Sequence, residues 1–172
     1  DMTMKLLLLF GGESSEHEVS LVSAANVYAA LDKAKYDIEL CYITKTGEWH
    51  YVERIDQRES DVSLTPLMGQ KRFSLSDGSH IAVDVMLPVL HGVHGEDGDV
   101  QAVARLVHVP CVGPSLIGAA ITMDKDITKR LAYEAGVPVV PWLIWQSSQP
   151  APVFDEVVQT LGPVLFVKPA HA

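Results

Sequence analysis

The chain has 172 residues, of which 48% are hydrophobic and 20% charged, so it is globular and long enough for one full domain and part of another. Its net charge is −9. Nucleic acids and anionic membrane surfaces carry negative phosphates, which attract basic proteins and repel acidic ones. Neither nucleic acid nor a membrane is therefore expected as a partner.

The start of the chain has the pattern of a parallel α/β fold. Residues 5–10 are a continuous apolar run that ends at a glycine pair, which predicts a buried strand. The run is too short for a signal-peptide core or a membrane span. Apolar residues at helical spacing predict a helix over 16–31, with Ser15 and Glu18 placed as a capping box. A strand over 36–44 follows, and this order implies a right-handed parallel crossover.

Two further features of this region exclude simple alternatives. The Gly11-Gly12 pair is not the Gly-x-Gly-x-x-Gly fingerprint, and no acidic residue closes the second strand, so a nicotinamide site is not expected. Cys41 and Cys111 both stand in apolar runs, so we interpret them as reduced core residues and not as a disulfide.

The segment before Leu90 combines strand and turn signals. Asp77-Gly78 is a strong hairpin signal that joins 72–75 to 80–83. The second arm is predicted to continue into a central strand that ends at Leu90. Residues 53–70 are polar and weakly patterned, which predicts a loop with a helical turn or two.

The predicted elements that follow complete a first domain. A helix is predicted over 100–109, a short strand over 109–113 and a helix from there to about residue 122. About four parallel strands would then alternate with helices. The expected fold of residues 1–122 is therefore a doubly wound parallel α/β sheet.

The remainder of the chain is more charged and less complete. A charged helix is predicted to begin at Met123 and to end at Ala135-Gly136, because glycine often follows a helix. Strands are predicted over 137–145 and 164–167, on either side of a helix over 154–161. This segment has too few apolar residues to close a core of its own.

The loop from His91 to Asp99 has the composition of a functional site. Two histidines and three carboxylates stand between three glycines, after a buried strand, where ligands sit in open α/β sheets. One hypothesis is a metal site, since imidazole and carboxylate are common ligands. The simpler hypothesis is that Asp97 or Asp99 caps the next helix and places negative charge at its positive end. The candidate ligands for a metal are His91, His94, Glu96, Asp97 and Asp99.

Four segments, in this order, resemble one known family. They are residues 10–21 (FGGESSEHEVSL), 91–98 (HGVHGEDG), 123–125 (MDK) and 166–169 (FVKP). Together they resemble the D-alanine–D-alanine ligases of the ATP-grasp superfamily. The resemblance covers essentially the whole chain and about half of a typical member, so the chain resembles the N-terminal half.

The resemblance implies a fold, a reaction and partners. Residues 1–122 would be the Rossmann-like pre-ATP-grasp domain with the first D-alanine site, and 123–172 the truncated start of the ATP-grasp domain. The implied reaction is ATP-dependent ligation of two D-alanines through an acyl phosphate, for peptidoglycan precursors in the cytoplasm. D-alanine and ATP are the implied ligands and a homodimer the implied assembly. Magnesium is the implied cofactor, with ligands expected beyond residue 172.

The resemblance also implies roles for individual residues. Glu18 matches the carboxylate that binds the ammonium of the first D-alanine, and Ser20 beside it would support that site. His91 matches the histidine near the reacting carboxylate. Lys125 and Lys168 match the lysines that contact the phosphates of ATP. Glu18 and His91 are thus the expected catalytic residues.

Other histidines and two other functions complete the expectations. His17 and His94 are predicted to be loop or surface residues, and the loop carboxylates to be structural. One alternative function is a non-catalytic fragment that only folds or dimerises. A weaker alternative is a metal-dependent hydrolase built on the His91 loop. The choice of second substrate among D-alanine, D-lactate and D-serine is left open.

Overall fold

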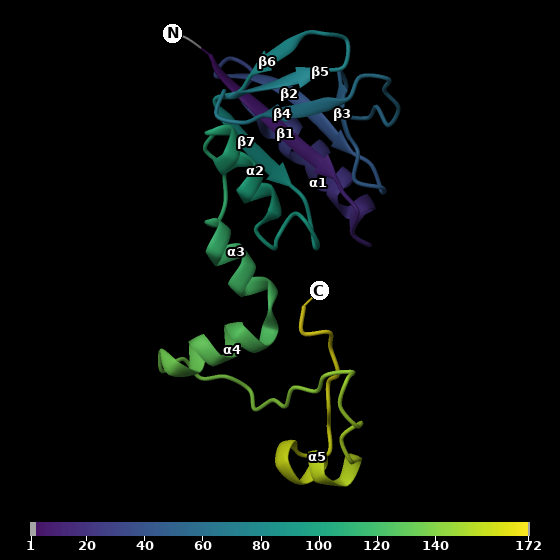
Figure 1. Ribbon diagram of the computed structural model, residues 1–172, viewed down its shortest axis with the longest axis vertical. Coiled ribbons are helices and arrows are strands. Elements are labelled where there is room, and N and C mark those ends of the chain that lie inside the picture. Colours follow the sequence, from purple (N-terminus) through teal and green to yellow (C-terminus); the bar gives the residue numbers. More distant parts are fainter. Residues whose placement is uncertain (1–2, 172) are drawn as a thin grey trace. The chain divides into compact units, whose positions relative to one another are not determined.

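The computed structural model describes residues 3–171, and the chain forms two compact units, Asp1–Ala120 and Ile121–Ala172 (Figure 1). In chain order, the helices and strands are β1 (Met4–Gly11), α1 (His17–Ala30), β2 (Tyr36–Ile43), β3 (Trp49–Val52), β4 (Leu64–Leu67), β5 (Arg72–Leu75), β6 (His80–Ala82), β7 (Val85–Val89), α2 (Asp99–Val107), α3 (Leu116–Met123), α4 (Lys125–Glu134) and α5 (Phe154–Leu161).

The main sheet of the first unit has the strand order β3-β2-β1-β7. Strand β1 pairs in parallel with β2 on one side and with β7 on the other, whereas β3 is antiparallel to β2. The predicted crossover through α1 is therefore confirmed. Because the chain leaves β1 toward β2 and returns to β7 on the opposite side, the carboxyl ends of β1 and β7 form a topological switch point.

Strand β1 is apolar at successive positions because both faces of the sheet are covered. Leu6, Leu8 and Phe10 pack in one core cluster with Ala24 of α1. The alternate residues of β1 pack in the other cluster, together with α2 and the small sheet β4-β5-β6. Helices α1 and α2 therefore lie on opposite faces of the sheet (Figure 1). The mixed α/β fold with a central parallel sheet is confirmed.

The hairpin of β5 and β6 is confirmed, but its second arm does not continue into the central strand. Strand β6 ends at Ala82, and β7 begins at Val85 in the other sheet. Between them, the Asp84 carboxylate accepts a hydrogen bond from the Lys5 amide, and the Asp84 amide donates to the Lys5 carbonyl. These two hydrogen bonds fix the chain where it passes from the small sheet to the main sheet.

Two other strand predictions for the first unit were wrong. Strand β4 lies in the segment predicted as loop, where Leu64 is buried against the core. The predicted strand 109–113 is reduced to one parallel bridge between Met86 and Cys111. Pro110 has no amide hydrogen to donate to a longer ladder, so the sheet has three parallel strands and not four.

The second unit is less compact. Gly162 directly follows α5 and Gly136 follows the C-cap residue of α4, and both have a positive φ, as predicted for helix ends. The strands predicted over 137–145 and 164–167 are wrong, because the structure has no strand in the described part of this unit. Prolines interrupt the first segment, and side chains such as Val167 are almost fully exposed, so no neighbouring strand supplies hydrogen bonds.

The expectation for the two cysteines agrees with the structure. Cys41 is buried, Cys111 is partly buried, and both are free thiols. Within residues 3–171, none of the helices has the length and apolar character required to cross a bilayer.

Limited proteolysis is expected to cut the second unit first. Residues 137–153 contain no helix or strand and are mostly exposed, whereas the strands of the first unit are paired and largely buried. A protease of broad specificity should therefore cleave within 137–153 before it cleaves between β1 and α2. Mass spectrometry of a digestion time course would identify the first cut, and an early cut within the main sheet would contradict this expectation.

Candidate functional site

A pocket of about 180 Å³ lies at the carboxyl ends of β1 and β7. Its walls come from the β1–α1 loop (residues 12–16), the β7–α2 loop (residues 90–98), the start of α2 and the region between β2 and β3. The lining residues are Gly11, Gly12, Glu13, Ile43, Gly47, Trp49, Leu90, His91, Val93, His94, Asp99, Val100 and Val103. The predicted functional loop is thus one wall of a pocket at the switch point.

Ser20 ties helix α1 to the two strands that end at the pocket. It is fully buried, and its hydroxyl accepts a hydrogen bond of 2.8 Å from the Gly11 amide and donates one to the Val89 carbonyl. Gly11 ends β1 and Val89 ends β7, so one side chain holds both strand ends against α1. The predicted contact of Ser20 with a substrate remains a prediction.

The two loops touch at Gly92. A Cβ atom on this glycine would lie 2.9 Å from Cβ of Ser14 and 3.4 Å from Oε2 of Glu16, and its φ is +75°. Only glycine permits this approach and this backbone conformation without strain. The Glu96 carboxylate accepts a 2.7 Å hydrogen bond from the Gly92 amide, which agrees with its predicted structural role.

His91 lies in the pocket wall, and a hydrogen bond to a residue of α1 orients its ring. Its Nε2 atom is 3.1 Å from the Ser23 hydroxyl, which leaves Nδ1 as the ring nitrogen available to a ligand. If the hydroxyl donates to Nε2, the neutral ring carries its hydrogen on Nδ1 and can donate to an anion. This arrangement suits a group that binds or stabilises a carboxylate.

Glu18 is exposed and pairs with Lys45, which follows β2. The Lys45 Nζ atom is 2.9 Å from its carboxylate, and this hydrogen bond holds the pKa of Glu18 below its ordinary value. The predicted capping box was wrong, because the helix begins at His17 and no side chain caps it. The Ser14 carbonyl instead accepts from the His17 amide, so the turn itself starts the helix.

Glu16 is a candidate that the sequence pattern did not single out. Its carboxylate lies beside Gly92, next to His91 along the chain, whereas Glu18 is turned to Lys45. Glu16 precedes the first helical residue and Glu18 lies in the first turn, and neither of them is among the residues that line the pocket. The Glu-x-Glu spacing was the available signal, but it does not say which carboxylate lies nearer the loop of His91.

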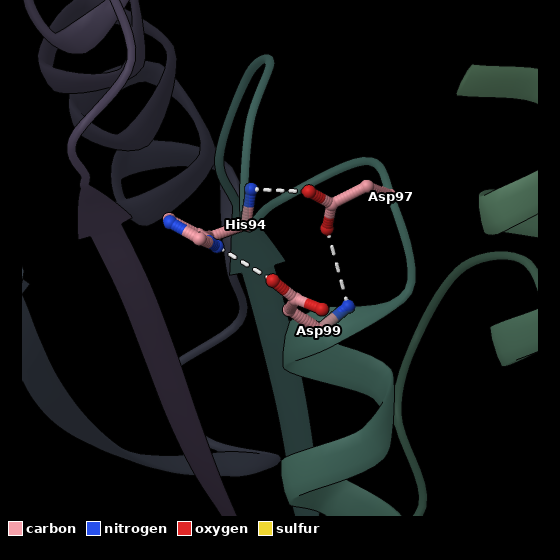
Figure 2. A group of neighbouring side chains, drawn as sticks. All are labelled: His94, Asp97 and Asp99. Atoms are coloured by element: carbon pink, nitrogen blue, oxygen red, sulfur yellow. Dashed lines mark hydrogen bonds and ion pairs between the residues drawn. The ribbon is translucent and has the colours of Figure 1, made fainter. Parts of the chain in front are cut away.

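His94, Asp97 and Asp99 form a cluster (Figure 2), and two of them, His94 and Asp99, line the pocket. The His94 Nδ1 atom is 2.5 Å from Asp99 Oδ2, and its Nε2 atom is 3.2 Å from Oε2 of Glu13. Asp97 accepts from the amides of His94 and Asp99. Asp99 thus places negative charge in the first turn of α2, as predicted. The predicted side-chain cap was wrong, because Gly98 is the N-cap residue and no side chain caps α2.

The donor chemistry of this cluster does not favour a metal. Both ring nitrogens of His94 face carboxylates, and Asp99 above all raises the pKa of His94, which favours the imidazolium. An imidazolium has no nitrogen lone pair to give to a metal. Both carboxylate oxygens of Asp97 already accept amide hydrogens, and His91 is bonded to Ser23 outside the cluster.

His17 is buried, so its predicted place at the surface was wrong. Its Nδ1 atom lies 2.6 Å from the Gly12 carbonyl, and its Nε2 atom lies 3.3 Å from the Tyr42 hydroxyl. The first turn of α1 presses this ring against β2, where it fixes the β1–α1 loop. The imidazole therefore belongs to the framework of the pocket.

The second unit brings together the two segments expected to bind ATP. The Lys125 amide donates a 2.8 Å hydrogen bond to the Ala170 carbonyl, and Asp124 and His171 form an antiparallel bridge. Residues 123–125 and the segment that begins at Lys168 are therefore neighbours. The side chain of Lys168 is exposed.

Comparison with known families identifies the first unit. Residues 5–114 match the family model described as "D-ala D-ala ligase N-terminus". A D-alanine–D-alanine ligase of Proteus mirabilis is 38% identical over 98% of this chain and 50% of its own length. D-alanine–D-alanine ligase A of Escherichia coli K12 is also 38% identical, over 98% of this chain and 51% of its own length. The chain spans about half the length of these curated relatives.

Solved structures agree with this match. The D-alanine–D-alanine ligase from Coxiella burnetii superposes with a TM-score of 0.83 and 29% identity, over 93% of this chain and 50% of its own. The VanG D-Ala:D-Ser ligase from Enterococcus faecalis superposes with a TM-score of 0.73 and 34% identity, over 81% of this chain and 44% of its own.

Proposed function

The chain belongs to the D-Ala–D-Ala ligase N-terminus family, and from this premise we propose that it is the first half of an ATP-dependent ligase. The ligase would join two D-alanines for the synthesis of peptidoglycan precursors. The observation that carries the proposal is the pocket at the ends of β1 and β7, where the loop of His91 meets the β1–α1 loop. The first D-alanine would bind there.

The charges around the pocket suit a small zwitterion. An amino acid places an ammonium and a carboxylate close together, so it needs an anion and a hydrogen-bond donor in one place. His91 would donate to the carboxylate. A glutamate at the start of α1 would accept from the ammonium; the family resemblance favours Glu18, whereas proximity to Gly92 favours Glu16. In the free chain, the Glu18 carboxylate is paired with Lys45, so an ammonium that binds to Glu18 would have to compete with this pair.

Lys125 and Lys168 are proposed to contact the phosphates of ATP, because lysine is a suitable point charge for phosphate. The neighbouring carboxylates do not fit a magnesium site. Asp124 accepts from two amides at the start of α4, and Asp126 bonds Trp142 and Arg130. The proposal therefore assigns no magnesium ligand to this chain.

The proposed reaction has two steps. An oxygen of the first D-alanine carboxylate attacks the γ-phosphorus of ATP, so ADP leaves and an acyl phosphate forms. The amine of the second D-alanine attacks the acyl carbon, phosphate leaves, and the amine loses a proton. His91 is placed to stabilise negative charge that develops beside the first carboxylate.

The test compares two polypeptides. A chain extended to the length of the relatives should release phosphate from ATP only when D-alanine is present. Assays with D-serine or D-lactate in place of the second D-alanine would show which second substrate the ligase accepts. A full-length protein without D-alanine-dependent phosphate release would contradict the proposal.

The 172-residue chain by itself is expected to release no phosphate above background. The reason is that, within residues 3–171, the carboxylates beside Lys125 are already bonded to other groups and offer no magnesium site for the charge on the γ-phosphate. The same assay on the 172-residue species, with its mass verified, checks this. D-alanine-dependent turnover by the short chain would show that the reaction needs less of the protein than we expect.

A further inference from the structure

His94 joins two walls of the pocket. Its ring lies between Glu13 of the β1–α1 loop, 3.2 Å from Nε2, and Asp99 at the start of α2, 2.5 Å from Nδ1. All three residues line the pocket. The ring therefore forms a bridge between the loop that follows β1 and the helix that follows β7.

The bridge requires the protonated ring. A neutral imidazole has one N–H group, whereas two carboxylate acceptors at opposite nitrogens need two donors. The charged groups that face the ring are Asp99 and Asp97 on its own side and Glu13 from the opposite loop. No lysine or arginine pairs with any of these groups within residues 3–171. The imidazolium thus neutralises part of an acidic wall.

Loss of the proton would break the bridge. One carboxylate would lose its donor, and three negative charges would then face each other without a cation between them. We propose that His94 is a positioning residue whose protonated ring clamps the β1–α1 loop onto the β7–α2 loop and so fixes the pocket that His91 lines. The clamp is a property of this chain, whereas its effect on ligation rests on the proposed function.

The direction of the pH effect follows from the charges. Asp99, with Glu13 and Asp97, raises the pKa of His94 above its ordinary value. The clamp is therefore complete below the ordinary pKa of imidazole and is lost as the pH rises through the raised pKa. A neutral glutamine at this position would leave the pocket equally loose at every pH.

The first experiment measures the clamp without any enzyme assay. NMR titration of the ring protons of His94 in the 172-residue chain should give a pKa above the ordinary value for an imidazole. Glu13→Gln and Asp99→Asn should each lower the pKa of His94, and circular dichroism spectra that match the parent would show that both variants fold. A pKa of His94 that neither variant moves would overturn the proposal, and so would a titration that changes when a chelator is added.

The second experiment uses the full-length ligase. His94→Gln should raise the KM for D-alanine about two- to fivefold below the raised pKa, as expected for an exposed ion pair, and should remove the rise in KM that the parent shows at higher pH. His80→Gln is the matched control and should match the parent. An inactive parent would contradict the proposed function but not the clamp. An active parent whose pH profile matches that of His94→Gln would overturn the clamp's effect on ligation.

Discussion

In the full-length ligase, Glu16→Gln is expected to raise the D-alanine concentration needed for half-maximal rate on the order of 30- to 1000-fold, with little change for ATP. Glutamine keeps the shape of the side chain but removes the charge that an ammonium needs, and charge-assisted hydrogen bonds are about twice as strong as neutral ones. The carboxylate of Glu16 lies beside Gly92, next to His91.

Glu18→Gln is the matched comparison, because it removes the same charge two residues away. It releases the exposed pair with Lys45, so its effect should be several-fold smaller than that of Glu16→Gln. Saturation curves in D-alanine and in ATP on both variants and the parent would measure this. A large effect confined to Glu18→Gln would instead support the assignment that the sequence motif suggests, and parent-like curves for both would remove the ammonium site from α1.

Gly11→Ala is expected to destabilise the first unit by about 3–5 kcal/mol. The residue has a φ of +95°, and an added Cβ atom would lie 2.2 Å from the Ile43 carbonyl oxygen. That oxygen also accepts the Gly12 amide at 2.9 Å, so it cannot move away without breaking a bond that shapes the pocket. Strain and overlap therefore add at this position.

Gly78→Ala separates these two causes. Gly78 has a similar φ of +93°, but nothing lies within 4 Å of its added Cβ atom. Its substitution should cost only the backbone strain, about 1–2 kcal/mol. Urea denaturation followed by circular dichroism would compare both variants with the parent. Equal losses of stability would mean that the contact with Ile43 can relax.

Local patterns in the sequence were sufficient for several elements. The apolar run of residues 5–10 predicted the central strand, because a strand covered on both faces needs an apolar residue at every position. Asp77-Gly78 predicted its hairpin. The glycines after α4 and α5 predicted where those helices end, since a positive φ is a property of single residues.

Strand length and pairing could not be predicted in the same way. The segment 109–113 has an apolar pattern but forms one bridge, and Leu64–Leu67 forms a strand within a polar stretch. Residues 164–167 are apolar and remain unpaired. A strand exists only where another strand satisfies its backbone groups, and that neighbour is distant in the chain.

The sequence by itself determined which segments are candidates for the site: the loop of His91 and the segment after β1 that carries Glu18. Only the tertiary structure decided what each side chain does there. Ser20 and His17 are buried between strand ends, Glu16 lies against Gly92 while Glu18 faces Lys45, and His94 bridges Glu13 and Asp99. The physical reason is that most of these contacts join residues far apart in the chain, where the packing of α1 and α2 on the sheet selects the partner.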